Sequence, residues 1–217
     1  MPALGLIDSG LDPAVIAAGA VLLGHGPALD AHGHGSVVSR LLAAAVTPSD
    51  LAGVAVFDHR GVTTPLAVAQ ALDLLVGQGV EMVVMALGLA HDREVLRLAC
   101  QRAVAAGIMV VASAPARGGP CYPASYPGIV AVSGDARCQP DQTSYFGGQP
   151  ALFGACVAPP PGVDRRFQGA SMAAGHFAAW VWRHFPNRAD RRMENLAAAC
   201  LFQGRERIVG AFCVEKC

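Results

Sequence analysis

Residues 82–114 read MVVMALGLAHDREVLRLACQRAVAAGIMVVASA, and this stretch decides the fold class. Residues 82–87 form an unbroken apolar run, which is typical of a strand buried on both faces. Residues 93–106 have the apolar spacing of an amphipathic helix and are followed by a glycine, a common helix terminator. Residues 108–112 form a second apolar run. The stretch therefore predicts a strand–helix–strand unit with parallel strands.

The same alternation runs through most of the chain. The predicted strands are residues 4–8, 54–57 and 129–132, and the predicted helices are residues 13–18, 36–45, 65–77, 172–185 and 188–200. Residues 134–169 are rich in proline and glycine and predict loops and short edge strands. We expect a single α/β domain over residues 1–217, in three layers, with a mostly parallel central sheet and helices on both faces.

Composition narrows the class of protein. Hydrophobic residues make up 53% of the chain and charged residues 15%. Every apolar run is interrupted before about 18 residues, so we expect no membrane partner. Sixteen basic and 16 acidic residues give a net charge of zero, which predicts no nucleic-acid partner. The Arg191-Arg192 pair is interpreted as part of a solvated helix face.

The N-terminus and the cysteines bear on the cellular compartment. The first ten residues, MPALGLIDSG, lack the pattern of an export signal and read as a core strand, so we expect neither an export signal nor a pro-segment. The seven cysteines contain no C-x-x-C pair and are Cys100, Cys121, Cys138, Cys156, Cys200, Cys213 and Cys217. We therefore expect reduced thiols, a cytoplasmic location, and neither a metal nor another cofactor.

Three short segments carry candidate chemistry: Ile7-Asp8-Ser9-Gly10, His34-Gly35-Ser36 and Gly169-Ala170-Ser171-Met172-Ala173. Taken alone, they read as a turn, a loop and a helix cap. Asp8 and the later residues Gly88 and Ser113 lie at the C-terminal ends of predicted parallel strands. Ligands of such sheets bind beyond the carboxyl ends of the strands, so one cleft could collect these residues.

Taken together, the three segments resemble the motifs of the subtilisin-like serine proteases. Asp8 matches the aspartate of D-[ST]-G, and Ser171 matches the serine of G-T-S-M-A-[ST]-P-H. His34 matches the first histidine of H-G-T-H-V-A-G, with Asp30 four residues before it. His32 is a competing candidate, but the predicted helix starts directly after His34. The resemblance implies a subtilisin-type fold with Ser171 as nucleophile, His34 as base and Asp8 as orienting acid.

The resemblance extends from residue 4 to about residue 200. Residues 85–88 resemble the M-S-L-G strand that pairs with the bound peptide, and residues 107–114 resemble the strand that walls the specificity pocket. The implied substrate-binding residues are Ala86, Leu87, Gly88, Ser113, Ala114 and Arg117. Arg117 would lie at the pocket rim and favour an acidic or polar residue before the scissile bond, although a solvated loop arginine is an equal alternative. His176 matches a helix-packing histidine of the family.

The chain departs from the family at the oxyanion hole. Ala116 stands where the family has an asparagine that donates a hydrogen bond, and Ala170 stands where it has threonine. Losing one such donor costs roughly 10²–10³ in turnover. Arg117, Ser113 or Gln168 could substitute, or a backbone N–H of a rearranged loop could. The third possibility is a pseudoenzyme that binds peptides without cutting them. The insertion that binds calcium in the family is also missing.

The motifs and the departures together predict a slow, selective endopeptidase. The chain is similar to small cytoplasmic subtilisin-like peptidases that remove leaders during maturation of a modified peptide or an enzyme subunit. Its implied partner is a polypeptide substrate, namely one dedicated leader-bearing protein. A peptide-binding chaperone of the same fold and a broad degradative protease are the alternatives.

Overall fold

A computed structural model describes residues 2–24, 30–148 and 150–205 of the chain. Its sheet has nine strands in the order β2-β3-β1-β4-β5-β6-β8-β7-β9. The strands are β1 (Leu4–Asp8), β2 (Val21–Leu23), β3 (Leu51–Ala55), β4 (Met82–Met85), β5 (Met109–Ser113), β6 (Val130–Gly134), β7 (Thr143–Gly148), β8 (Ala151–Ala155) and β9 (Phe202–Gln203). The α-helices are α1 (Pro13–Ala17), α2 (His34–Ala43), α3 (Pro65–Gly77), α4 (Glu94–Ala105), α5 (Ala170–His184) and α6 (Met193–Ala199). Short 3-10 turns lie at Pro48–Asp50, Arg165–Phe167 and Arg188–Asp190.

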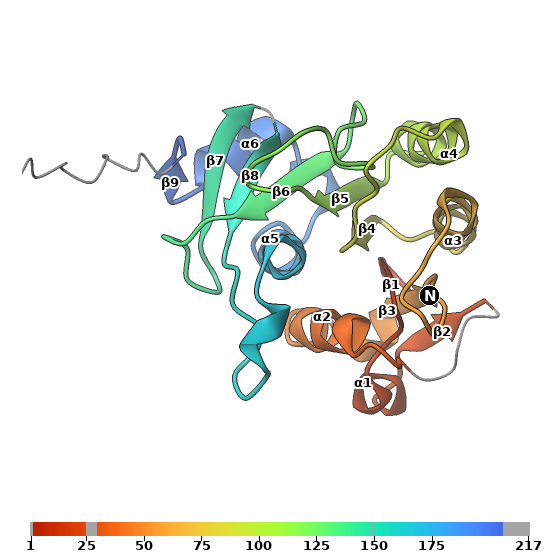
Figure 1. Ribbon diagram of the computed structural model, residues 1–217. Helices are drawn as coiled ribbons and strands as arrows, with labels where there is room; N and C mark the ends of the chain where they lie inside the picture. The colour runs from red at the N-terminus through yellow and green to blue at the C-terminus, as the bar shows by residue number, and fades with distance from the viewer. Residues whose placement is uncertain (1, 25–29, 149, 206–217) are drawn as a thin grey trace, which may run out of the picture.

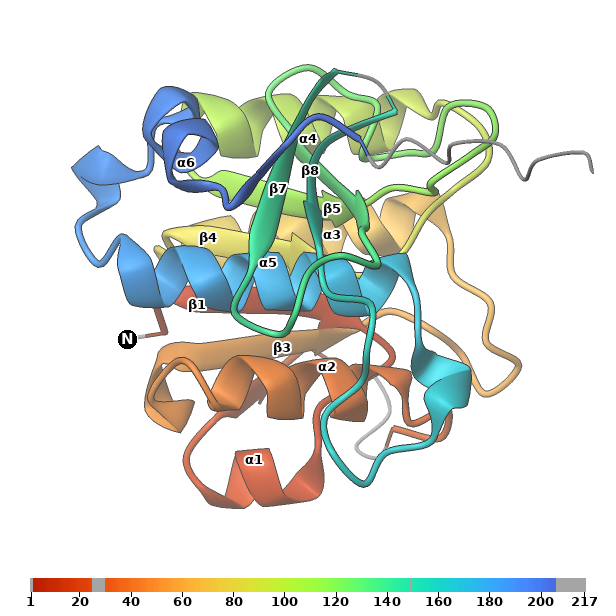
Figure 2. The same ribbon diagram turned by 90° about the vertical axis from the view of Figure 1, so that its left-hand side faces the viewer.

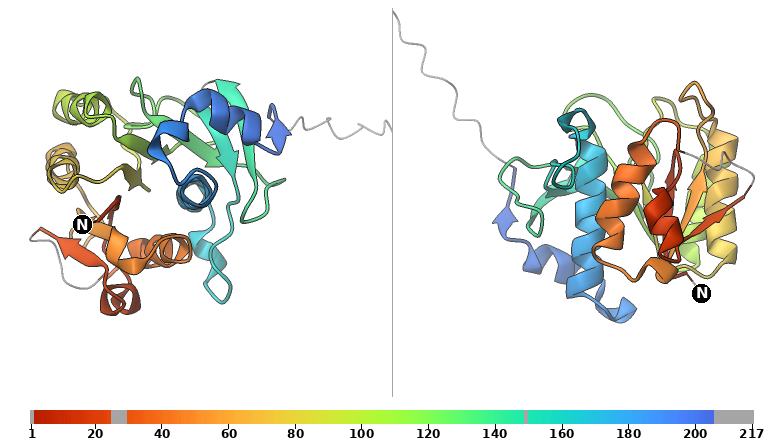
Figure 3. Two further views of the ribbon diagram at one scale, coloured as in Figure 1. Left: turned by 180° about the vertical axis from the view of Figure 1, so that it is seen from behind. Right: turned by 90° about the horizontal axis from the view of Figure 1, so that it is seen from below.

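The sheet is covered on both faces. All strand pairs are parallel except β7 with β8. Helices α3 and α4 lie on one face, and α2 and α5 lie side by side on the other (Figures 1 and 3). The three-layer α/β fold with a mostly parallel sheet is therefore confirmed.

The core is divided by the sheet, because neighbouring side chains of a strand point to opposite faces. Leu4 and Leu6 of β1 pack in the cluster that contains α2 and α5, whereas Ile7 packs in the cluster that contains α3 and α4. The prediction for α3 matches its observed bounds. Thr64 Oγ1 accepts a hydrogen bond from Ala67 N at 3.1 Å and caps this helix.

Two strand predictions were wrong in detail. β3 is Leu51–Ala55 where 54–57 was predicted, because residues 51–55 pair with β1 along its whole length. Among the described residues of the segment 134–169, both strands are internal and not edge strands, since β8 pairs with β6 and β7, and β7 also pairs with β9. The edges of the sheet are instead β2 and β9, neither of which was predicted.

The prediction for Arg191 was also wrong. The predicted helix 188–200 is divided into a 3-10 turn and α6, and Arg191 between them is 6% exposed. Its Nε donates to the carbonyl of Phe185 at 2.9 Å, and its Nη1 pairs with Glu81 Oε2 at 3.0 Å. The guanidinium, which also lies over the ring of Trp182, thus joins the end of α5 to the sheet. Arg192 is exposed, as predicted.

Candidate active site

The candidate site lies where parallel strands end and where α2 and α5 begin. Asp8 is the last residue of β1 and is 1% exposed. Its Oδ1 accepts hydrogen bonds from Ser9 N at 2.7 Å and from Ser9 Oγ at 3.2 Å. Gly35 permits the first turn of α2 to approach this strand end, because a Cβ there would overlap the carbonyl oxygen of Gly10. Gly35 therefore allows the close approach of α2 to the end of β1 that the site needs.

His34 is the first residue of α2 and faces Asp8. Its Nδ1 lies 2.8 Å from Asp8 Oδ1 and 2.9 Å from Oδ2. Because a carboxylate only accepts, Nδ1 carries the proton and Nε2 of the neutral ring is free to act as a base. His32 Nε2 bonds instead to the carbonyl of Asp58 at 2.8 Å. Of the two candidate histidines, His34 is thus the one paired with Asp8.

The surroundings of His34 favour its protonated form. Burial by itself lowers the pKa of the ring, but the hydrogen bond to Asp8 and the charges of Asp8 and Asp30 outweigh it. The net result is a pKa above the ordinary value of 6.5. The carboxylates thus make the ring a better proton acceptor, which is what a general base needs.

Asp30 holds the start of α2 from outside the helix. Its Oδ1 accepts from Gly33 N at 2.9 Å, and its Oδ2 accepts from Ser36 N at 2.7 Å. The N-cap residue, Gly33, has no side chain to do this. Burial raises the pKa of Asp30, yet hydrogen bonds from Ser36, Ser9 and Gly33 bring it below its ordinary value. Asp30 therefore stays ionised beside His34.

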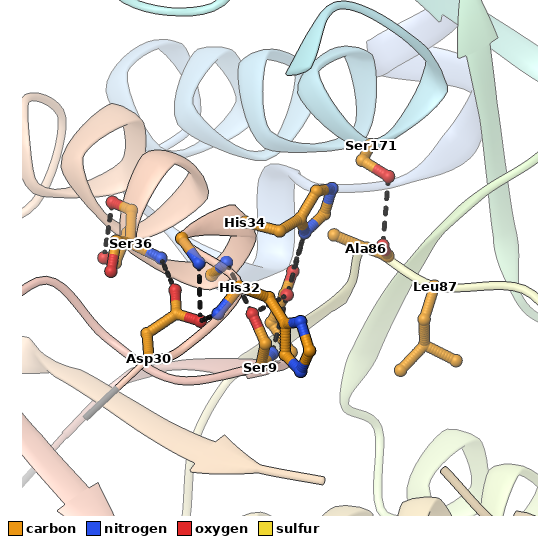
Figure 4. A network of polar contacts seen from close by, with 12 residues as sticks. Ser9, Asp30, His32, His34, Ser36, Ala86, Leu87 and Ser171 are labelled. Atoms are coloured by element: carbon orange, nitrogen blue, oxygen red, sulfur yellow. Dashed lines mark hydrogen bonds and ion pairs between the residues drawn. The ribbon is translucent and has the colours of Figure 1, made fainter. Parts of the chain in front are cut away.

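Ser171 lies in the first turn of α5 and faces the same space as His34 (Figure 4). Its Oγ donates to the carbonyl of Ala86 at 3.0 Å. Among the described residues, no hydrogen bond joins Ser171 to His34. Contacts of this kind often form only when substrate is present, so the hydroxyl would need to leave Ala86 and turn toward Nε2.

The residues considered for the oxyanion hole differ in position and in hydrogen-bond partners. Ala116 lies in an exposed loop and its methyl group cannot donate. Ser113 Oγ is directed at the carbonyl of Leu87 at 3.4 Å, and Gln168 Oε1 pairs with Arg165 at 3.5 Å. Arg117 is exposed and lines a separate cavity, together with Ala116, Phe146 and Arg205. The backbone N–H of Ser171 remains, since the first amides of a helix have no partner within it.

The expected peptide-binding segment borders the site. Ala86, Leu87 and Gly88 line one cavity with Asp8 and His34. Behind Gly88, the chain is fixed by Leu89 and Tyr122, whose backbones exchange hydrogen bonds of 2.7 and 2.9 Å. Ser113 and Ala114 are near the site but buried, at 7% and 1% exposure, and Ala114 N donates to Val132. Their assignment to the specificity pocket remains a prediction.

For four residues of the candidate site, no sequence motif predicted a position in the cavity. They are His32, Phe57, Gly61 and Thr63, and all line the cavity in front of His34. All but His32 come from the loop between β3 and α3. Only His32 was considered from the sequence, and then as an alternative base.

The described part of the chain contains no group of three or more His, Cys, Asp or Glu that could hold a metal. No helix there is long and apolar enough to cross a membrane. The described cysteines are free and are Cys100, Cys121, Cys138, Cys156 and Cys200. Cys213 and Cys217 lie outside the described residues. His176 is 7% exposed and bonds to the carbonyl of Ala158 at 2.8 Å, which suits a structural role.

Comparison with known proteins gives two similar sequences. A thermostable alkaline protease of Halalkalibacterium halodurans is 32% identical over 202 residues, which are 82% of this chain and 55% of that protein. Subtilisin DY of Bacillus licheniformis is 26% identical over 220 residues, which are 88% and 80% of the two chains. The chain therefore spans about half the length of the first relative. No protein-family model matches it.

Solved structures decide the fold. A cold adapted subtilisin-like serine proteinase superposes with a TM-score of 0.64, at 18% identity, over 90% of this chain and 79% of its own. This chain has the subtilisin fold. A mutant of the protease domain of PatA gives 0.59 at 18% identity over 86% and 81% of the two chains. The prenylagaramide maturation protease PagA gives 0.56 at 20% identity over 83% and 73%. Within the subtilisin fold, Asp8 lies at the carboxyl end of β1, His34 at the start of α2 and Ser171 in the first turn of α5.

Proposed function

We propose that the chain is a subtilisin-type serine endopeptidase with Asp8, His34 and Ser171 as its catalytic triad. The observation that carries this is the pairing of His34 Nδ1 with both oxygens of Asp8, at 2.8 and 2.9 Å, beside Ser171. Ser171 Oγ attacks the scissile carbonyl while His34 Nε2 takes its proton, then returns that proton to the leaving amine. Water releases the acyl group from Ser171 with His34 again acting as base.

The substrate binds extended along residues 86–88, as an added strand. The carbonyl of Ala86, which holds the Ser171 hydroxyl in the free chain, is an acceptor that a substrate N–H can use. Binding then releases the hydroxyl for His34. Ser113, Ala114 and Arg117 contribute to the pocket for the residue before the scissile bond, and the Ser171 N–H supports the oxyanion.

Leader removal is the proposed role of this activity. PagA, which shares the fold, is named a maturation protease. The lack of a side-chain donor at Ala116 favours a slow enzyme with one dedicated, leader-bearing polypeptide substrate in the cytoplasm. A narrower candidate is the leader-removing protease for the gamma subunit of quinohaemoprotein amine dehydrogenase. Its test is hydrolysis of that precursor compared with casein, and rapid casein digestion would contradict a dedicated role.

Fluorophosphonate labelling tests the activity itself. We expect a covalent adduct on Ser171 in the purified chain and none in Ser171→Ala. Substitution of an exposed serine outside the site, Ser49→Ala, is the matched control and should label fully. An intact fold with no adduct on Ser171 would overturn the proposed hydrolysis.

A peptide-binding chaperone is the second candidate, favoured by the Ser171–Ala86 hydrogen bond and by Ala116. Both features reduce catalysis but leave the peptide-binding segment, residues 86–88, open to a peptide. This candidate predicts that a leader peptide binds equally well to the native chain and to Ser171→Ala, and emerges uncut from both. Mass spectrometry of the bound peptide distinguishes the two functions.

A further inference from the structure

A cavity of about 310 Å³ opens in front of the candidate base. Besides Asp8 and His34, its walls include the peptide-binding residues 86–88 and residues from the loop between β3 and α3. Its volume is at the small end of the range of ligand sites, roughly 300–1,000 Å³. A cavity of this size beside the peptide-binding edge suits a substrate side chain better than a separate ligand.

The first polar group of this cavity is the imidazole of His32. Its Nε2 lies 2.8 Å from the carbonyl of Asp58, and a carbonyl only accepts, so Nε2 carries the proton of the neutral ring. Nδ1 is then an acceptor, and no residue in the described part of the chain hydrogen-bonds to it. Figure 4 places His32 on the side of His34 away from Ser171.

The ring of His32 is held by an ordered turn. Asp58 Oδ1 accepts from the backbone N–H groups of Arg60 and Val62, each at 2.9 Å. Gly61 has a φ of +74° and leaves room for the ring, because a Cβ there would lie 3.3 Å from His32 Cε1. The imidazole is therefore preorganised to accept a hydrogen bond from a ligand.

The second polar group is the hydroxyl of Thr63. Thr63 Oγ1 is buried and has no hydrogen-bond partner among the described residues, although the residue lines the cavity. Buried hydroxyls are nearly always paired. The Thr63 hydroxyl is an exception, because it lacks an acceptor for its proton. Binding a ligand to this hydroxyl requires χ1 to rotate to another staggered position that turns it toward the cavity, where the ligand supplies the acceptor.

The charge and polarity of the cavity limit the class of side chain that it can bind. The carboxylate of Asp8 lines the cavity, and that of Asp30 accepts from His32 N at 3.2 Å, so an anionic side chain is repelled. An ammonium group could bond to His32, but it has no acceptor for the Thr63 hydroxyl. An apolar side chain satisfies neither group. A carboxamide satisfies both, since its NH₂ donates to His32 Nδ1 and its oxygen accepts from Thr63.

We propose that the His32–Thr63 pocket, lined by His32, Phe57, Gly61, Thr63 and Leu87, binds a glutamine or asparagine side chain of the substrate close to the scissile bond. His32 and Thr63 determine this specificity, and Phe57 and Leu87 pack against the apolar stem of the side chain. The inference rests on the proposed peptidase function, because it names the class of substrate that the same site selects.

The first test measures hydrolysis by the purified full chain. Fluorogenic peptides carry Gln, Glu, Lys or Leu in turn at each of the three positions on either side of the cleavage site. At one position we expect Gln to exceed the other three in kcat/KM by at least about 10-fold, because a polar site rejects analogues that leave it unpaired. His32→Phe and the isosteric Thr63→Val should bring the ratios close to one. His59→Phe, at an exposed histidine of the same loop, should leave them unchanged.

A second test measures binding without hydrolysis. Ser171→Ala is titrated with the same peptides by fluorescence polarisation, and we expect the same preference for Gln and its loss with Thr63→Val. Hydrolysis without any Gln preference would overturn the pocket assignment and leave the peptidase intact. Selective binding without hydrolysis by the native chain would overturn the peptidase and support the pocket. A Lys or Glu preference, or no peptide binding at all, would overturn the pocket assignment.

Discussion

The two sides of the candidate site differ in the burial and hydrogen bonding of their functional side chains. On the side of the base, Asp8 is 1% exposed and bonded to both Ser9 and His34. On the side of the nucleophile, Ser171 Oγ makes one hydrogen bond, to the carbonyl of Ala86, and Ala116 lies in an exposed loop. The base is thus oriented in the free chain, whereas the nucleophile still has to turn.

The difference follows from the elements that carry the two sides. Asp8 ends an inner strand and His34 begins a helix packed on that strand, so neither can move without disturbing the core. Figure 2 shows α2 and α5 in front of the sheet. The Ser171 hydroxyl requires only rotation about χ1, and the loop after β5 carries few buried contacts. We therefore expect bound substrate to complete this side of the site.

The largest expected effect tests whether the two sides act as one unit. Ser171→Ala and His34→Ala should each reduce turnover of a cleaved peptide by roughly 10⁶-fold, the scale known for subtilisin-type triads. The double variant should be no slower than either single variant, because each loss already removes the nucleophilic step. Stopped assays with mass-spectrometric detection measure these rates. Multiplied losses in the double variant would mean that the two residues act independently.

The next effect concerns the base alone. Asp8→Asn should reduce kcat by about 10⁴-fold, because an amide can donate to Nδ1 and favours the wrong tautomer of His34. Asp12→Asn, at another buried aspartate, is a control for stability because Asp12 bonds to Arg40 at 2.6 Å and not to His34. Kinetics with a fluorogenic peptide check this. If Asp8→Asn kept near-native kcat, the hydrogen bonds of Asp8 would not orient the base.

A gain of function tests the side of the nucleophile. Ala116→Asn introduces the missing side-chain donor and should raise kcat by about 10-fold or more, since one such donor is worth roughly 10²–10³ where the geometry is ideal. Ala116→Leu, similar in size but without a donor, should give no increase. The measurement is kcat/KM and kcat for a single peptide. Equal rates for the Asn variant and the native chain would mean that another group already fills the role.

The fold was predictable where local sequence and long-range packing agree. The helix α3 was predicted correctly because Thr64 caps it, Pro65 opens it and its apolar residues follow a helical period. The start of β3 was missed because its pairing with residues 4–8 of β1, a distant segment, has no local signature. The burial of Arg191 was missed for the same reason, since its partner Glu81 lies on a distant segment.

The candidate site was predictable only where its residues fall in motifs. The sequence indicated Asp8, His34 and Ser171 because each lies in a short motif that resembles one of the subtilisin-like serine proteases. It did not indicate the cavity role of His32 or Thr63, because a loop without a motif sets their positions. Hydroxyl orientation, such as that of Ser171 toward Ala86, depends on tertiary contacts that no spacing encodes.

The smallest expected effect concerns the support of the base by Asp30. The charge of Asp30 contributes to the raised pKa of His34, and only neutral His34 can act as base. Activity should therefore fall as the pH drops through a midpoint above 6.5, and Asp30→Asn should move that midpoint to lower pH. Because the amide nitrogen cannot accept from Ser36 N, the variant should also lose about 1 kcal/mol of the free energy of unfolding, as for a lost helix cap.

Profiles of kcat/KM against pH and urea unfolding at constant pH measure the two parts separately. Asp164→Asn is the matched control: Asp164 Oδ1 accepts from Arg166 N at 2.8 Å in an exposed turn, so it should affect neither the midpoint nor α2. If Asp30→Asn is less stable but the acid limb of its pH profile does not move, the role of Asp30 is only to cap α2. A shifted acid limb of the pH profile would show that the charge of Asp30 raises the proton affinity of His34 without direct contact.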